Sequence, residues 1–158
     1  MIDFIRKIFI INICVLINAC SLVSSDPILK TDEDYKFKNY SKKWTKVKDK
    51  KVDHLFKHQE GGLVYAKSYC DHFKGSLEKI SDSFIKKINY KKLTEQFENQ
   101  VNGIKGRWTS LISTVENQVV YIYHQALKNS QCYYDITGIG HDKEFKAEFQ
   151  KLLRGIRL

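Results

Sequence analysis

Apolar and polar residues alternate along most of the chain after residue 50, and this period of two predicts β-strands. The alternating runs are rich in Tyr, Val, Ile, Thr and Trp, which suit a pleated surface buried on one side. The predicted strands are residues 52–58, 63–70, 92–101, 106–115, 118–127 and 131–139. Gly61-Gly62 predicts the turn between the first two, and Glu116-Asn117 and residues 128–130 predict the turns of a final three-strand meander.

Two segments switch to the helical period. Residues 76–88 and 142–156 each place apolar side chains on one helical face, with Ser76 and Asp142 available at their starts. The two apolar stripes are Leu77, Ile80, Phe84 and Ile88, and Phe145, Phe149, Leu152, Leu153 and Ile156. Stripes at this spacing are far more often core than binding surface, so each helix should lie on a sheet. The pattern therefore predicts an α+β fold, an antiparallel β-sheet with flanking amphipathic helices.

The first residues of the chain have a different character. Residues 8–19 carry no charge and follow Arg6 and Lys7. This stretch is shorter than the ~20 residues that a helix needs to cross ~30 Å of hydrocarbon. A basic start, a short apolar middle and a small residue at the end are typical of a secretory signal peptide. We therefore expect residues 1–19 to be removed from the mature protein.

The apolar stretch ends in the sequence LINAC. Ile17 stands three places before Cys20, and Ala19 stands directly before it. This resembles the lipobox of bacterial lipoproteins, in which the cysteine thiol is linked to diacylglycerol and the peptide before it is cut. The resemblance implies lipid attachment at Cys20, and Ser21, where an inner-membrane retention signal often has Asp, favours the periplasmic face of the outer membrane. The alternative is an ordinary signal peptide cut near residues 21–26, with Cys20 discarded.

Loss of the signal peptide would leave a chain that suits one tethered domain. Removal of Arg6, Lys7 and Asp3 changes the net charge from +9 to +8. Residues 20–41 contain a proline, several serines and a small acidic cluster without periodicity, which predicts a lipid-anchored linker. Residues 42–158 would then form the domain.

Four cysteines divide between these segments. Cys14 lies in the predicted signal peptide and Cys20 is the predicted lipid site, so Cys70 and Cys132 remain for the domain. Two thiols in an exported domain favour a disulfide, because an oxidising compartment pairs them. Each cysteine also shares a strand face with small or apolar residues that could lie beneath a helix. The alternative is two unpaired buried cysteines that pack as small hydrophobes.

The C-terminal half carries a second resemblance. Residues 106–140, followed by residues 145–158, are similar to the end of the PsbP-like family, in which Gly-Arg enters a long hairpin and a short strand follows the last helix. The sequence GIRL at 155–158 occupies that final place. The same region resembles small uncharacterised lipoproteins of deltaproteobacterial type near their paired cysteines. These resemblances imply a PsbP-like α/β/α sandwich over about residues 42–158 and supply no catalytic residues.

The histidines and glycines match no catalytic or metal motif. His54 and His58 are four residues apart, but on a strand this spacing separates them by about 13 Å. The other histidines, His72, His124 and His141, have no His-x-x-x-His or Cys-x-x-Cys partners. The chain also lacks a Gly-x-Ser-x-Gly elbow and a phosphate-binding glycine loop. We therefore expect no metal site, no cofactor and no enzymatic activity.

A lysine-rich run around Trp44 is the remaining binding candidate. A basic patch with an aromatic residue could bind anionic lipid or an acidic glycan, while a solvated face is the alternative. Such a patch could also bind nucleic acid, which is not the partner we expect. The candidate residues are Lys42, Lys43, Trp44, Lys46, Lys48, Lys50 and Lys51, and further lysines recur at positions 86, 87, 91 and 92.

Two functional hypotheses follow from these observations. The first is a non-enzymatic cell-envelope lipoprotein that faces the periplasm as a binding or scaffold module, with a partner that the sequence does not identify. The second is a small exported hydrolase in which Asp135, a lone carboxylate among aromatic residues, acts with His124 or His141. A pocket where Asp135 meets one of these histidines would favour the hydrolase, and a solid core would favour the binding module.

Overall fold

The computed structural model of the chain describes residues 35–38, 40–70 and 75–158. The predicted signal peptide, Cys20 and His72 lie outside these described residues. No helix in the described ranges combines the length and the apolar character that a membrane crossing requires.

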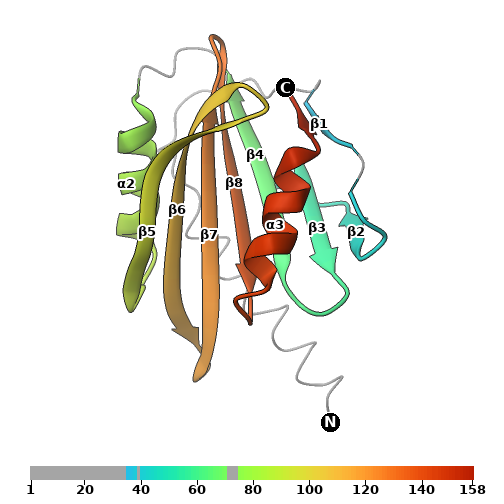
Figure 1. Cartoon of the computed structure of the whole chain (residues 1–158), viewed down its shortest axis with the longest axis vertical. Helices are drawn as coiled ribbons and strands as arrows, with labels where there is room; N and C mark the ends of the chain where they lie inside the picture. Colours follow the sequence, from blue (N-terminus) through green and yellow to red (C-terminus); the bar gives the residue numbers. More distant parts are fainter. Residues whose placement is uncertain (1–34, 39, 71–74) are drawn as a thin grey trace.

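The centre of the fold is a seven-stranded antiparallel sheet with the strand order β2-β3-β4-β8-β7-β6-β5 (Figure 1). All six strands predicted from the period of two are present, and the final meander is confirmed. The strands are β2 (Trp44–Val47), β3 (His54–His58), β4 (Leu63–Cys70), β5 (Lys92–Val101), β6 (Ile104–Val115), β7 (Gln118–Lys128) and β8 (Cys132–Gly140).

The hairpin turns form where the sequence predicts them. Gly61 and Gly62 have φ of 94° and 107°, a conformation that only glycine adopts without strain. Glu116 and Asn117 have φ of 50° and 64°, so both central residues of the β6–β7 turn are left-handed, as in the tight turns that match strand twist. These turns set the pairing of the long strands.

The two predicted helices cover opposite faces of the sheet. The helix α2 (Leu77–Lys87) packs on β6 and β7, and Ser76 caps it by accepting a hydrogen bond of 3.2 Å from the amide of Lys79. The helix α3 (Phe145–Arg154) packs on β8, and the carboxylate of Asp142 accepts a bond of 2.8 Å from the amide of Phe145. The predicted α+β fold, with a sheet between amphipathic helices, is therefore confirmed (Figure 1).

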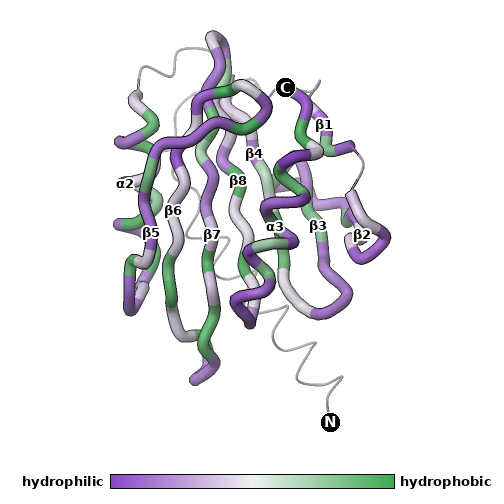
Figure 2. The backbone as a smooth tube through the Cα atoms, viewed as in Figure 1, coloured by the Kyte–Doolittle hydropathy of each residue, from purple (hydrophilic) through white to green (hydrophobic). Residues whose placement is uncertain are grey.

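Both faces of the sheet are packed because its central strands alternate between two apolar sets. Figure 2 shows the resulting mixture of hydropathy along the central strands, while the edge strand β5 is mostly hydrophilic. On the α3 side the rings of Phe145 and Phe149 lie directly on the backbone of β8, and a Cβ atom at Gly140 would overlap the ring of Phe145. The buried side chains include Tyr123, Ile136, Phe149 and Leu152 on the α3 side, and Tyr65, Phe84, Leu111 and Ile122 on the α2 side.

The predicted boundary between linker and domain at residues 41 and 42 is wrong, because the fold begins earlier. The strand β1 (Lys36–Phe37) pairs antiparallel with β9 (Ile156–Arg157), the short strand after the last helix. Tyr35 is only 1% exposed, and its hydroxyl donates a bond of 3.2 Å to Asp53. A strand of two residues has no detectable period, so the sequence pattern could not reveal it.

The predicted disulfide between Cys70 and Cys132 is confirmed. The two cysteines are directly opposite one another where β4 pairs with β8, with their Cα atoms 4.1 Å apart. The face assignment is also confirmed, since Ala66 pairs with Ile136 and Ser68 pairs with Tyr134 on the same side of the sheet. The bridge therefore joins two strands that already share a ladder.

We predict that replacing both cysteines by alanine lowers the free energy of unfolding by about 4 kcal/mol, the chain-entropy value for a loop of this length. The bridge spans 62 residues, so the reduced unfolded chain gains many conformations. Urea unfolding of the oxidised chain, the reduced chain and Cys70→Ala/Cys132→Ala measures the effect. Equal urea midpoints for the oxidised chain and the double variant would contradict it.

We also predict that the fold loses stability as the pH falls from 7.5 to 5.5. Burial lowers the pKa of His54 below its ordinary 6.5, against the opposing effect of its hydrogen bond to the carbonyl of Tyr35, and burial also lowers the pKa of His141. A histidine with a lowered folded pKa binds more protons when unfolded, so acid favours unfolding, by at most about 1.4 kcal/mol per pH unit for each histidine.

Unfolding free energies measured in urea at several pH values test this dependence. His54→Gln keeps a donor for the carbonyl of Tyr35 and should reduce the slope against pH. A slope identical to that of the unchanged chain would show that His54 does not contribute.

Candidate functional site

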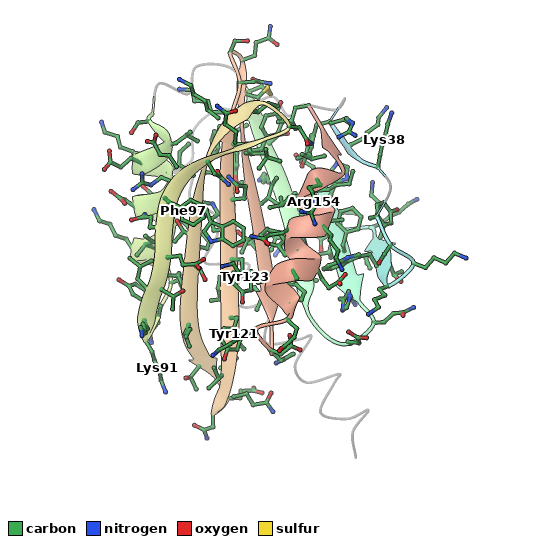
Figure 3. The ribbon with its side chains drawn as sticks, viewed as in Figure 1. Lys38, Lys91, Phe97, Tyr121, Tyr123 and Arg154 are labelled. Atoms are coloured by element: carbon green, nitrogen blue, oxygen red, sulfur yellow. A yellow bond between two sulfur atoms is a disulfide. The ribbon has the colours of Figure 1, made fainter. Side chains whose placement is uncertain are left out.

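The face of β5, β6 and β7 on the α3 side extends beyond the helix and carries a group of aromatic residues. Phe97 is 46% exposed there, and its ring centroid lies 6.4 Å from that of the buried Trp108. The ring of Trp108 lies 5.8 Å from that of Tyr123. Figure 3 shows Phe97, Tyr121 and Tyr123 on this side of the sheet. We call Phe97, Trp108, Tyr121 and Tyr123 the aromatic face.

A charged pair joins the aromatic face to α3. The Nζ atom of Lys146 donates bonds of 2.7 Å to both carboxylate oxygens of Glu95, and it lies 5.7 Å from the ring centroid of Trp108. The indole Nε1–H of Trp108 donates a bond of 3.0 Å to the same carboxylate. The hydrogen bond from Lys146 is the main reason why the pKa of Glu95 lies below its ordinary value. The charges are therefore used to fix β5 against α3.

An amide pair joins β5 to β7 across β6. Asn99 and Gln125 exchange two hydrogen bonds of 2.8 and 2.9 Å between their side-chain amides. The bonds pass over Gly106, where a Cβ atom would overlap the amide nitrogen of Gln125. Gln125 is fully buried, so this bridge satisfies a polar group that would otherwise be costly to bury.

The polar groups beside the aromatic face are bonded within the protein. Burial, with a smaller effect from Tyr121, raises the pKa of Tyr123 to about 12, so its phenol stays neutral at physiological pH. The carboxylate, amine and amides around it are bonded to one another. What the face presents to a partner is the ring of Phe97 and part of Tyr121. Sequence reasoning missed this group, although Phe97 is an isolated aromatic residue in the polar stretch 94–100.

The structure brings Asp135 to His124, one of the two predicted hydrolase partners. The Nε2 atom of His124 lies 3.2 Å from Oδ1 of Asp135, at ion-pair distance but without the alignment of a hydrogen bond. The hydroxyl of Thr137 donates a bond of 3.2 Å to the same oxygen. His124 is fully buried, and the ring of Phe84 from α2 stacks on it with centroids 4.0 Å apart. A substrate has no access to the imidazole in this arrangement.

The other histidines have separate surroundings. His54 contacts the carbonyl of Tyr35 at 3.1 Å, and the ring of His58 lies 4.7 Å from that of Trp44. His141 lies beside the β3–β4 turn at Gly61. Within residues 35–38, 40–70 and 75–158, no three His, Cys, Asp or Glu side chains are grouped in a way that could hold a metal ion.

The lysine-rich run lies on and around β2, the edge strand next to β3. Trp44 points into the core and is buried against His58 and Phe145, so its ring is not part of the exposed surface. Lys43 forms an ion pair of 3.1 Å with Glu60. The exposed lysines of the run are Lys42, Lys43, Lys46, Lys48, Lys50 and Lys51. Lysines on a short edge strand also discourage pairing with other strands, which is a structural reason for their presence.

The predicted lipid site cannot be described with the others, because Cys20 lies outside the described residues. Lipid attachment, the signal peptide and the outer-membrane location therefore stay predictions. Among the predicted residues that the structure describes, it brings together Cys70 with Cys132 and Asp135 with His124.

No protein-family model matches the chain, and no curated protein matches its sequence. Several solved structures resemble it in three dimensions. LpqN of Mycobacterium tuberculosis, described as involved in cell envelope biogenesis, is 6% identical with a TM-score of 0.63, covering 86% of this chain and 89% of LpqN. PA94 of Pseudomonas aeruginosa, a protein of unknown function, is 6% identical with a TM-score of 0.53, covering 84% and 88%.

The comparison with PsbP addresses the predicted fold directly. The solution structure of cyanobacterial PsbP from Synechocystis sp. PCC 6803 is 12% identical with a TM-score of 0.60, and the match covers 86% of this chain and 96% of that one. Likeness at such low identity shows the fold and leaves the activity open. The PsbP-like architecture predicted from the C-terminal half is thus confirmed for the described residues as a whole.

Proposed function

We propose that this chain is a lipid-anchored protein of the cell envelope whose folded domain is a non-enzymatic binding module. The observation that carries the proposal is the disulfide between Cys70 and Cys132, in a chain whose first residues have the pattern expected of a secretory signal that ends in LINAC. A bridge of this kind persists in an oxidising compartment, which is where such a signal delivers a protein. The shared fold with LpqN, a protein described as involved in cell envelope biogenesis, supports the same setting.

Binding is favoured over catalysis because the candidate catalytic groups are buried or already bonded within the protein. The ring of Phe84 stacks on His124, which lies beside Asp135. Beside the aromatic face, Lys146 is bonded to Glu95 and Gln125 to Asn99. The competing hydrolase would require α2 to move Phe84 off the imidazole before a substrate could enter. A rigid scaffold with an exposed ring needs no such movement to bind a partner.

The exposed lysines near β2 extend the proposal to the membrane surface. Acyl chains on Cys20 would hold the domain at the bilayer, since each buried methylene contributes about 0.8 kcal/mol. Residues 20–34 can span at most about 50 Å, so β2 would stay within reach of the head groups. Each lysine near an anionic surface contributes about 1 kcal/mol within a Debye length. We propose that Lys42, Lys46, Lys48 and Lys50 orient the domain on anionic lipid.

We predict that Cys20→Ala abolishes labelling by a palmitate analogue and leaves unprocessed precursor, because the thiol is the atom that accepts the lipid. Gel mobility and labelling of the full chain in a bacterial host measure both effects. Cys14→Ala is the matched control and should mature and be labelled normally. Normal labelling of Cys20→Ala would refute the lipid anchor.

We predict that replacing Lys42, Lys46, Lys48 and Lys50 by Gln removes most binding of the lipid-free chain to anionic vesicles, and that added salt has the same effect on the unchanged chain. Vesicle sedimentation with phosphatidylglycerol and with phosphatidylcholine measures the binding. The control replaces Lys79, Lys86, Lys91 and Lys92 by Gln, which removes the same charge from exposed positions on and after α2. An equal loss of binding in both variants would show that binding depends on the net charge of the chain, and it would contradict a specific surface at β2.

A further inference from the structure

The two edges of the sheet differ in length and in protection. The edge strand β2 has four residues and β5 has ten. Within the part of the chain that the structure describes, β5 pairs only with β6, so its other side presents unpaired backbone N–H and C=O groups. Long edges of this kind are templates for pairing with another strand. The short edge is surrounded by lysines. By contrast, β5 has a lysine only at its first residue, has no proline, and is irregular only between Leu93 and Glu95, so the segment from Glu95 to Val101 pairs regularly with β6.

The sequence of β5 is nearly symmetric about its exposed aromatic residue. Phe97 is flanked by Gln96 and Glu98, and then by Glu95 and Asn99. Its pairing with β6 places Glu95, Phe97 and Asn99 on the α3 side, where Phe97 is opposite Trp108. In an antiparallel self-pairing centred on Phe97, each acidic residue would therefore be opposite an amide of the other copy.

We infer that β5 pairs with β5 of a second copy of this chain, antiparallel and with Phe97 at the two-fold axis. Phe97 then meets Phe97 of the other copy, Glu95 is opposite Asn99, and Glu98 is opposite Gln96. Aromatic pairs and pairs without like charges are favoured between neighbouring strands. A two-fold axis normal to the sheet keeps both α3 faces on one side, so the two aromatic faces become continuous across the interface.

The charge pattern favours a second copy over an unrelated peptide and excludes some of the possible registers. Centring the pairing on Glu95 or on Glu98 would place identical carboxylates opposite one another, and like charges in that position are destabilising. The register centred on Phe97 avoids this and covers the most exposed aromatic side chain of the described residues. An unrelated strand would have no reason to match this internal symmetry. The inference deepens the proposed binding module by naming a second copy as the partner of the exposed Phe97 ring, and it does not depend on the lipid anchor or on the lysines.

Cysteine crosslinking of the full chain tests the proposed axis. Directly opposed residues of an antiparallel pair have Cα atoms about 4.5 to 5.5 Å apart, which suits a disulfide. Phe97→Cys in membranes under mild oxidation should therefore give a covalent dimer on non-reducing gels. Val119→Cys is the matched control, because Val119 is 48% exposed but lies on β7, away from this edge. Absence of the dimer in Phe97→Cys, or equal dimer in both variants, would overturn the inference.

A charge exchange at the same position tests the symmetry. Phe97→Lys and Phe97→Glu each place like charges at the axis, so each alone should raise the dimer dissociation constant by about tenfold or more in sedimentation velocity. A mixture of the two variants should restore the dimer, because Lys then faces Glu. Thermal unfolding of each variant checks that the monomer is intact. The inference would be overturned if the unchanged chain is monomeric or if the mixture stays monomeric. Either result would indicate that a strand of another protein pairs with the edge of β5.

Discussion

The pairing of β4 with β8 is the interaction on which the whole sheet depends. Every other adjacent pair in the seven-stranded sheet joins strands that are consecutive in the sequence, whereas β4 and β8 are separated by α2 and three strands. This ladder therefore joins the N-terminal strands to the C-terminal meander. A slip of one residue would exchange the two faces of a strand, and the disulfide between Cys70 and Cys132 holds the register that puts each face under its own helix.

The fixed register also explains why the two faces of the sheet hold such different polar groups. Thr109, His124 and Thr137 are in line across β6, β7 and β8 on the α2 side, where the ring of Phe84 stacks on His124. Their side chains are short or planar and fit beneath a ring. On the α3 side the polar groups are long and reach across strands, as Glu95 does to Lys146 and Asn99 does to Gln125. The polar groups on the α2 side are therefore buried beneath the helix, while those on the α3 side lie beside α3, next to the exposed ring of Phe97.

The sequence was sufficient for features that depend on local pattern and insufficient for those that depend on pairing between distant strands. Period, caps and left-handed turns predicted the six longer strands and both helices. The same reasoning missed β1 and β2, because two or four residues do not establish a period, and it treated Trp44 as part of a basic surface when alternation turns its ring inward. The cysteines were paired correctly because few alternatives remained.

Candidate functional groups were harder to predict for the same reason. The sequence offered both His124 and His141 as partners of Asp135, and only the β7–β8 register shows that His124 is the one that Asp135 meets. Glu95 and Lys146 are 51 residues apart, on a strand and a helix whose relative position the pattern does not specify. Sequence periodicity assigns a residue to a face, but it does not say which residue of another element lies opposite.

The two edges of the sheet differ because the strands near β5 are long and the strands near β2 are short. The strands β5, β6 and β7 have ten, twelve and eleven residues, while β2 and β3 have four and five, so the sheet is long at one edge and short at the other. A short edge is protected adequately by a few lysines and by the buried anchor of Trp44. A long edge exposes more backbone N–H and C=O groups than a few lysines can protect. Pairing with β5 of a second copy gives these groups hydrogen-bond partners, while the acidic residues of β5 discourage other strands. The alternation of acids and amides around Phe97 therefore serves selectivity as well as solubility.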